Sequence, residues 1–316
     1  MRPGEVESLL QLEPADRLEP LTELGRGLLG DDASAEERGK VIGALIAVIG
    51  SGEGNALARM SAGEVLGALG DTRLRHPSDA DYWTEFDVDG HRVAVGRQLV
   101  TVSEISRFFA GGGYEDDSLW SEAGRHWRDT RRTLWSDLAA EPDSAPLVVP
   151  NQPAIGVTWF EALAYAKSSG ARLLHLDERL FVMRGAANRP YPWGQPFGYG
   201  NANTSEEGLG KPCAVGLYTR DCTPEGVYDL AGNVAEWTMD EADDDSSTEE
   251  IIIHAAHAAA ASKPAPRTAV TTPFFTRLRQ RMTWGTTTKE EKRSLWKSGE
   301  HPYTRRGTLD IALKEV

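Results

Sequence analysis

Four side chains in this sequence could act as nucleophiles or metal ligands at short spacing: Cys213 and Cys222, and the pair His254 and His257. The histidines stand three positions apart in the segment HAAH, so on a helix they would share one face. No nearby carboxylate completes a metal-binding triad, and the simpler interpretation is a solvated, alanine-rich helix. The cysteines are close in sequence, and no secretory signal is visible, so we expect both to be reduced and structural.

Other catalytic patterns are absent from the sequence, which has no G-x-S-x-G elbow, no glycine-rich phosphate loop and no H-E-x-x-H motif. The 316 residues carry a formal net charge of −14, and an acidic surface repels phosphate groups. We therefore expect no nucleic-acid partner and no membrane partner. No apolar run is long enough to span a bilayer, and together with the missing signal this favours a cytoplasmic protein.

Residues 1–74 contain no aromatic residue and predict a small helical segment. Ser34 and Glu37 have capping-box spacing, which predicts the start of one helix, and a second helix should end at Gly70. The stretch LGALGDTRL resembles the end of a HEAT-type helical repeat, although a helical cap on the following domain is an equal alternative. Two or three helices fit into this length.

The following residues predict short elements joined by ordered loops. Alternation in TEFDVDGHRVAVGRQLV, with DG at its turn, predicts a β-hairpin between residues 75 and 100. Thr101 with Glu104, and Thr158 with Glu161, repeat the capping-box spacing, and HLDERLFVMRG predicts a further short helix. Large aromatic side chains are expected to hold the loops from the core: Trp120, Trp127, Trp159, Trp193 and Trp237.

Residues 240–266 break this composition. An acidic run leads into Ile251–Ile253 and a run of alanines, which is typical of an exposed insertion that is partly helical and partly disordered. The chain then returns to globular composition and ends in TLDIALKEV, which predicts a strand.

The order of these motifs resembles the formylglycine-generating (sulfatase-modifying factor) family from about residue 80 to Val316. The segments that carry the resemblance are QPAIGVTWFEALAYAKSSGARL, YPWG and above all GVYDLAGNVAEW. The resemblance implies an α+β fold of the C-type lectin-like kind, loop-rich, over residues 75–316, with the insertion at about 240–266. One departure is RLLHLDERL, which stands where the family has RLPTEAEWE and places Arg179 at the position of its Trp.

Formylglycine formation in this family needs two cysteine thiolates that bind copper(I), a soft ion suited to sulfur. By resemblance they would lie between Trp284 and the final strand, yet residues 281–316 contain no cysteine. Cys213 and Cys222 fall in the loop before GVYDL, in a different part of the fold. We therefore expect no copper and no formylglycine formation.

The resemblance also implies calcium, a hard ion that takes carboxylates and backbone carbonyls. One set of ligands would be the side chains of Asn203 and Glu207 with the carbonyls of Thr204 and Leu209. The second set would be the side chains of Asp229 and Glu236 with the carbonyls of Gly232 and Val234.

These observations favour a non-catalytic recognition module that binds a protein partner or a small ligand. Related domains serve in bacterial signalling and conflict systems and as variable proteins of diversity-generating retroelements. The candidate binding surface near the C-terminus consists of residue types common in binding hot spots, together with their neighbours: Trp284, Thr286, Thr288, Lys289, Trp296, Tyr303, Arg305 and Arg306. One alternative is a sulfatase-modifying oxidoreductase or a related metal-dependent enzyme, and another is a purely structural subunit.

Overall fold

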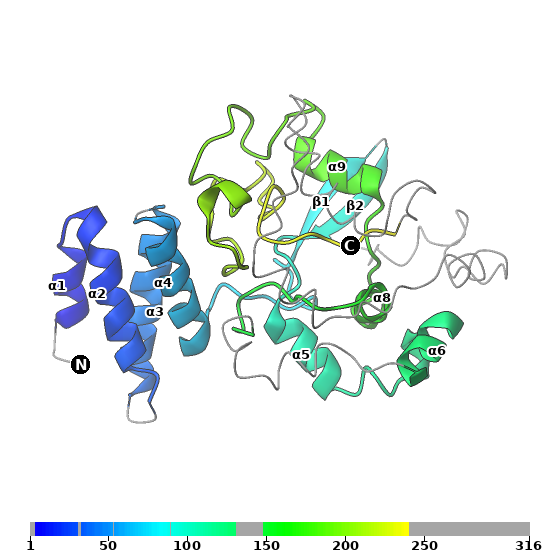
Figure 1. The fold of residues 1–316 in the computed structure, drawn as a ribbon, viewed down its shortest axis with the longest axis horizontal. Coiled ribbons are helices and arrows are strands. Elements are labelled where there is room, and N and C mark those ends of the chain that lie inside the picture. Colours follow the sequence, from blue (N-terminus) through cyan, green and yellow to red (C-terminus); the bar gives the residue numbers. More distant parts are fainter. Residues whose placement is uncertain (1–3, 31–32, 53, 89, 131–147, 240–316) are drawn as a thin grey trace.

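The computed structural model describes residues 4–30, 33–52, 54–88, 90–130 and 148–239. A layer of four helices lies beside a larger body with one small sheet and long loops (Figure 1). This mixture of helix and little sheet agrees with the α+β class expected from the sequence. None of the helices in these ranges has both the length and the apolar character needed to cross a membrane.

The first part of the chain forms helices α1 (Glu5–Leu10), α2 (Pro14–Gly27), α3 (Ala35–Gly50) and α4 (Ala56–Leu69). The capping box of Ser34 and Glu37 starts α3, and Gly70, with a left-handed backbone, ends α4, as the sequence predicts. The expected two or three helices are wrong in number, because α1 and α2 fold as well. The signal for α2 was present: Pro14 stands in the first helical turn, where its missing N–H costs nothing.

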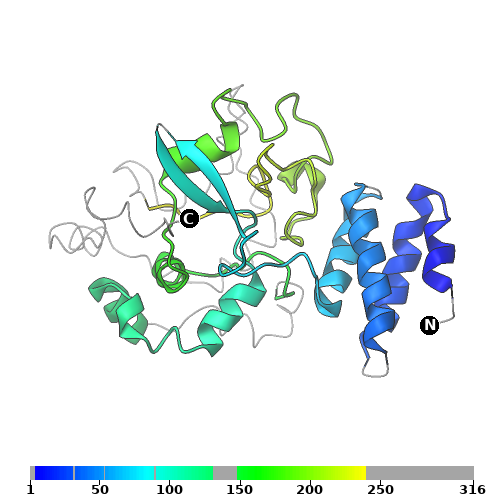
Figure 2. The ribbon, with the colours of Figure 1, turned by 180° about the vertical axis from the view of Figure 1, so that it is seen from behind.

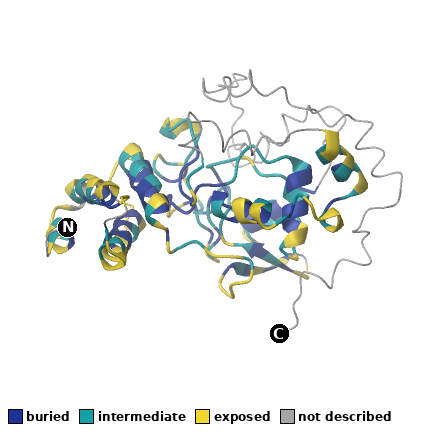
Figure 3. Ribbon diagram, turned by 90° about the horizontal axis from the view of Figure 1, so that it is seen from below, coloured by how far each residue is buried: buried dark blue, intermediate teal, exposed yellow. Residues whose placement is uncertain are grey.

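Helix α4 packs against both its neighbouring helices and the loop-rich body. The apolar core of the four helices is continuous with Cys213, Leu217 and Tyr218, which belong to a loop of that body. Figure 3 shows buried positions both in the helical layer and in the adjoining loop-rich body. The expected division at residue 74 stays a prediction about folding units, since the packing itself runs across it.

Polar contacts fix the same junction. The Asn151 side-chain amide is fully buried and donates to the Gly63 carbonyl at 3.0 Å and to Asp71 Oδ2 at 2.9 Å. Lys211 Nζ lies 2.6 Å from Glu64 Oε1, and the Arg59 guanidinium lies 4.6 Å from the centre of the Tyr218 ring. The helices therefore hold the site-bearing loop by apolar contact, hydrogen bonds and charge together.

The predicted hairpin is confirmed as strands β1 (Trp83–Val88) and β2 (His91–Gly96), paired antiparallel with Val88 opposite His91. Gly90 has a left-handed backbone in the turn between them, which a two-residue hairpin requires. Helix α9 (Leu176–Arg184) lies across the hairpin and packs Val182 and Met183 against it (Figure 2).

A third layer is built from α5 (Val102–Ala110), α6 (Glu122–Thr130), α8 (Trp159–Ser168) and the short 3-10 helix η1 (Asp117–Leu119). Both predicted capping boxes start their helices, Thr101 with Glu104 at α5 and Thr158 with Glu161 at α8. The core of this layer is largely aromatic, with Phe108, Trp120, Phe160 and Tyr165 buried together.

Residues 185–239 carry the candidate site and contain, as regular structure, the 3-10 helix η3 (Ser205–Glu207). Their loops are held by side-chain bonds to backbone carbonyls, as the aromatic content predicts, although Trp193, expected in the core, is only partly buried and lines a surface hollow. Trp237 Nε1 donates to the Val157 carbonyl and Trp159 Nε1 to the Thr238 carbonyl, both at 2.9 Å. These reciprocal bonds tie α8 to the end of the loop.

Candidate functional site

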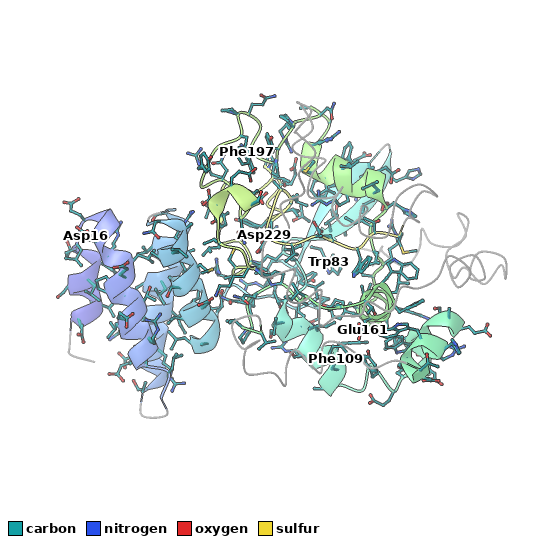
Figure 4. All side chains as sticks on the ribbon, in the orientation of Figure 1. Asp16, Trp83, Phe109, Glu161, Phe197 and Asp229 are labelled. Atoms are coloured by element: carbon teal, nitrogen blue, oxygen red, sulfur yellow. The ribbon has the colours of Figure 1, made fainter. Side chains whose placement is uncertain are left out.

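Two buried carboxylates form the centre of the 213–236 loop. Asp221 and Asp229 are each 1% exposed, and Asp229 is labelled near the middle of the molecule in Figure 4. Asp229 has a left-handed backbone, and its Oδ2 accepts a hydrogen bond from the Gly216 amide at 2.7 Å. Asp221 accepts from the Ala231 amide at 3.0 Å. Backbone amides thus position both carboxylates within the fold.

Burial controls the protonation of this pair. It raises the pKa of Asp229 to about 7, and the amide of Gly216 only partly offsets the shift. Burial, followed by the negative charge of Asp229, raises the pKa of Asp221 to about 8. A buried carboxylate without a matching cation keeps its proton more readily. At neutral pH, Asp221 and Asp229 together therefore carry less than two negative charges.

Asn233 joins the two loops that the sequence predicted as separate ligand sets. Its side-chain Oδ1 accepts hydrogen bonds from the backbone amide of Cys213 at 2.9 Å and from Asn203 Nδ2 at 3.2 Å. The backbone amide of Asn233 donates to the Asn203 carbonyl at 2.9 Å. A Cβ on the adjacent Gly232 would lie 2.6 Å from the same carbonyl oxygen, so only glycine fits there. The structure therefore brings residues 203 and 229–236 to one place.

The third feature of this region is an ion pair between Arg179 and Glu236. Arg179 on α9 is 3% exposed, and its Nη2 lies 2.6 Å from Glu236 Oε1 and donates to the Leu230 carbonyl at 2.6 Å. Nε donates to the same carboxylate oxygen at 3.2 Å. Sequence reasoning placed Glu236 as a calcium ligand and treated Arg179 only as a departure from the family motif. The opposite charges of Arg179 and Glu236 were the signal for this pair that sequence reasoning missed.

The remaining side chains predicted as calcium ligands hold the loop. Asn203 Nδ2 donates to the Lys211 carbonyl at 3.1 Å, and Glu207 accepts from the Gly200 amide and, at 3.3 Å, from the Tyr218 hydroxyl. Within the described ranges, no three His, Cys, Asp or Glu side chains gather as a metal-binding group. Calcium binding by Asn203, Thr204, Glu207 and Leu209, or by the 229–236 set, stays a prediction.

Both cysteines are free thiols, as expected. Cys213 is fully buried, and burial raises the pKa of its thiol well above the ordinary value. Burial also raises the pKa of Cys222, which is only partly covered. A thiolate is disfavoured at both positions, and it is the thiolate that attacks or binds copper.

Two surface hollows flank this region. The first, of about 360 Å³, is lined by aromatic side chains, an arginine and their neighbours: Trp193, Gln195, Pro196, Phe197, Gly198, Tyr199, Asn201 and Arg220. Tyr191 stacks in parallel on Trp193, with ring centres 4.9 Å apart, and Phe197, another lining residue, is labelled in Figure 4. Tyr199 is 79% exposed, so this hollow offers open π faces beside a cation.

The second hollow, of about 440 Å³, lies between the end of α3 and the chain leaving β2. Arg73, Arg75 and Arg97 line it; Arg73 is paired with Asp71 at 2.7 Å and Arg75 with Asp81 at 2.6 Å. Its positive charge is therefore largely matched within the protein.

Several predicted features lie outside the described residues. These are the insertion at 240–266 with His254 and His257, the final strand, and the predicted binding surface: Trp284, Thr286, Thr288, Lys289, Trp296, Tyr303, Arg305 and Arg306. All of them stay predictions.

Comparison with known proteins places this arrangement in context. The model of the sulfatase-modifying factor enzyme 1-like domain family matches residues 59–297, beginning inside α4. The chain is 32% identical over 162 residues to hercynine oxygenase from Mycolicibacterium thermoresistibile, which covers 48% of this chain and 36% of that protein. It is 36% identical over 113 residues to formylglycine-generating enzyme from Mus musculus, covering 31% of this chain and 30% of that enzyme.

A further relative is the serine/threonine-protein kinase pkn1 of Chlamydia pneumoniae, 32% identical over 151 residues, or 45% of this chain and 21% of the kinase. The chain thus spans about a third or less of the length of these curated relatives. Because they are named as enzymes, the sequence-based expectation of a non-catalytic recognition module is wrong.

Proposed function

The chain belongs to the sulfatase-modifying factor enzyme 1-like domain family, and we propose that it is part of an oxygen-dependent oxidoreductase related to hercynine oxygenase. The observation that carries the proposal is the 32% identity to hercynine oxygenases from three mycobacterial species, each over 48% of this chain. An oxygenase, by its name, combines a substrate with oxygen.

The thiols of this chain favour an oxygenase over a formylglycine generator. Copper(I) chemistry needs accessible thiolates, whereas Cys213 is fully buried and the pKa values of both cysteines are raised. Residues 281–316 add no further sulfur from cysteine. The chain therefore lacks the donor set that copper chemistry of that type requires.

Oxygen chemistry draws on a metal or another redox cofactor, which activates dioxygen when bound. The described side chains do not by themselves form a site for such a metal, because no three potential ligands gather among them. The described residues would bind and orient the substrate.

The aromatic hollow is the surface best suited to that task. Trp193 and Tyr199 present π faces that can hold a planar or cationic group, and Arg220 can pair with a carboxylate. This combination suits a small substrate that carries both an unsaturated or cationic part and an acid group.

Several finer expectations accompany this proposal. They are a C-type lectin-like fold for residues 75–316, a HEAT-like relationship for residues 1–74, a cytoplasmic location, and a protein partner or small ligand in place of nucleic acid or membrane.

An oxygen-uptake assay tests the proposal. The purified full chain is loaded anaerobically with Fe(II) or with Cu(I) and exposed to oxygen with and without hercynine. A cysteine peptide of the sulfatase type is tested in parallel. We expect metal-dependent oxygen uptake with the small substrate, a product heavier by oxygen in mass spectrometry, and an unchanged peptide.

Two outcomes contradict this expectation. If the peptide loses its thiol and gains an aldehyde, the formylglycine-generating function replaces the oxygenase proposal, and a Cys213→Ser/Cys222→Ser variant shows whether these thiols are responsible. If oxygen uptake stays at the level of the free metal with every substrate, the oxygen-dependent function is wrong.

A further inference from the structure

The loop 229–236 contains its own cation. The Arg179 guanidinium reaches it from α9, with the side chain only 4% exposed, and bonds to a carboxylate and to a backbone carbonyl. Carboxylates and backbone carbonyls are also the ligands that calcium prefers. We propose that the guanidinium of Arg179 takes the place of the calcium ion expected at Asp229 and Glu236, so that this loop is held without metal.

The geometry of the pair supports this replacement. Arg179 Nη2 and Nε both approach Glu236 Oε1, at 2.6 Å and 3.2 Å, and Nη2 also reaches the Leu230 carbonyl at 2.6 Å. Charge-assisted bonds of this length are among the stronger hydrogen bonds in proteins. Oε1 of the carboxylate that would bind calcium is therefore already engaged, and its partner is a fixed positive charge.

A calcium ion placed on the same carboxylate would meet that charge directly. If calcium drew Glu236 away, Arg179, which is buried on a helix, would keep one short contact to a carbonyl and one 3.4 Å contact from Nη1 to Met183 sulfur. A buried charge without its partner is strongly unfavourable. The positive charge fixed at Glu236 Oε1 therefore disfavours a calcium ion on this carboxylate.

The sequence points to the same exchange. Arg179 stands where the family motif has Trp, a side chain that carries no charge and could not neutralise Glu236. The neighbouring acid Asp229 still accepts a backbone bond from Gly216. Arg179 thus supplies one positive charge next to the carboxylate of Glu236. This proposal is independent of the oxygenase activity proposed above.

Thermal melting with calcium or EGTA tests the replacement in the full chain, after removal of metal has been verified. We expect the melting temperature of the unmodified protein to be the same with EGTA and with millimolar calcium. In Arg179→Met, Glu236 is released, so we expect a lower melting temperature in EGTA and an increase when calcium is added. A second change, Glu236→Gln, should abolish that increase.

Arg172→Met is the matched control, because Arg172 forms a bidentate pair at 2.7 Å with Glu178 in the first turn of the same helix. It should lower the melting temperature without creating a calcium response. If Arg179→Met is soluble only with calcium, the proposal is supported. If it is insoluble in both conditions, calcium titration of the unmodified protein decides the question.

Two results overturn the proposal. One is a melting temperature of the unmodified protein that falls on chelation, with Glu236→Gln abolishing the fall, because calcium would then occupy the site despite Arg179. The other is a folded Arg179→Met protein that shows no calcium response, because the ion pair would then be a local contact at a loop that never held metal.

Discussion

Helices α1–α4 and the 213–236 loop are held by opposite kinds of interaction. The interior of the helices is apolar, with Leu18, Leu21, Leu45 and Leu66 at most 1% exposed. The loop buries Asp221, Asp229 and Arg179 and satisfies them with backbone amides, carbonyls and Glu236. One region is therefore stabilised by packing, which varies little with pH, and the other by charges and hydrogen bonds, which depend on it.

The packing side of this comparison is tested by Leu45→Ala in α3. Leu45 is fully buried, so its removal should lower the free energy of unfolding by about 2–5 kcal/mol at any pH from 5 to 8. Urea denaturation measures the change. Leu57→Ala, at a side chain 64% exposed, is the control and should cost less than about 0.5 kcal/mol. A small effect of Leu45→Ala would mean that apolar packing of these helices contributes little to the free energy of unfolding.

The charged side is tested by pH. The folded pKa values of Asp229 and Asp221 are raised to about 7 and about 8, above the ordinary 3.8, so between those values the folded state holds more protons than the unfolded state. The free energy of unfolding should therefore fall as the pH rises from 5 to 8. At about 1.4 kcal/mol per pKa unit, the fall is on the order of 3 kcal/mol for Asp229 and on the order of 4 kcal/mol for Asp221.

Asp221→Asn is the control for this pH dependence, because the amide has the shape of the protonated acid and cannot titrate. Its unfolding free energy should fall less steeply over the same range, measured by urea denaturation in EGTA. Asp71 and Glu178 have lowered pKa values, so they lose their contribution at lower pH and stay ionised in this window. A wild-type curve that is flat from pH 5 to 8 would contradict the prediction.

The junction between the two regions is tested by Gly67→Ala. A Cβ at Gly67 would lie 2.3 Å from Asn151 Oδ1 and 2.6 Å from Val149 Cγ1, so it should cost about 1–3 kcal/mol by overpacking. Gly43→Ala in α3 meets no atom within 4 Å and should raise stability by about 0.5–1 kcal/mol. If Gly67→Ala and Gly43→Ala changed the melting temperature equally, Gly67 of α4 would not be in close contact with Asn151 and Val149.

The sequence predicted the elements whose signals are local. Three capping boxes, the hairpin turn at Gly90 and the end of α4 at Gly70 all depend on a few neighbouring residues, and all are found. Helices α1 and α2 were missed because their apolar positions are sparse, and they become stable by packing on α3 and α4.

The site was harder to predict because it depends on contacts between distant segments. Arg179 and Glu236 are 57 positions apart, and Asn151 meets Asp71 across 80. The resemblance identified the 229–236 loop and implied calcium there, but a ligand set borrowed from a family carries no information about a charged partner such as Arg179, which reaches the loop from another helix. The function expected from missing cysteines was wrong for a similar reason, since other enzymes use the same scaffold.

The placement of Cys213 gives the junction a built-in chemical reporter. Its sulfur lies 3.5 Å from Asn233 Oδ1, within the apolar core shared with the helices, and it is sealed from solvent. With the less covered Cys222 changed to Ser, a thiol reagent can label the chain only during moments when the helices lift from the loop. The labelling rate then becomes a direct measure of how often this protein opens between its two parts.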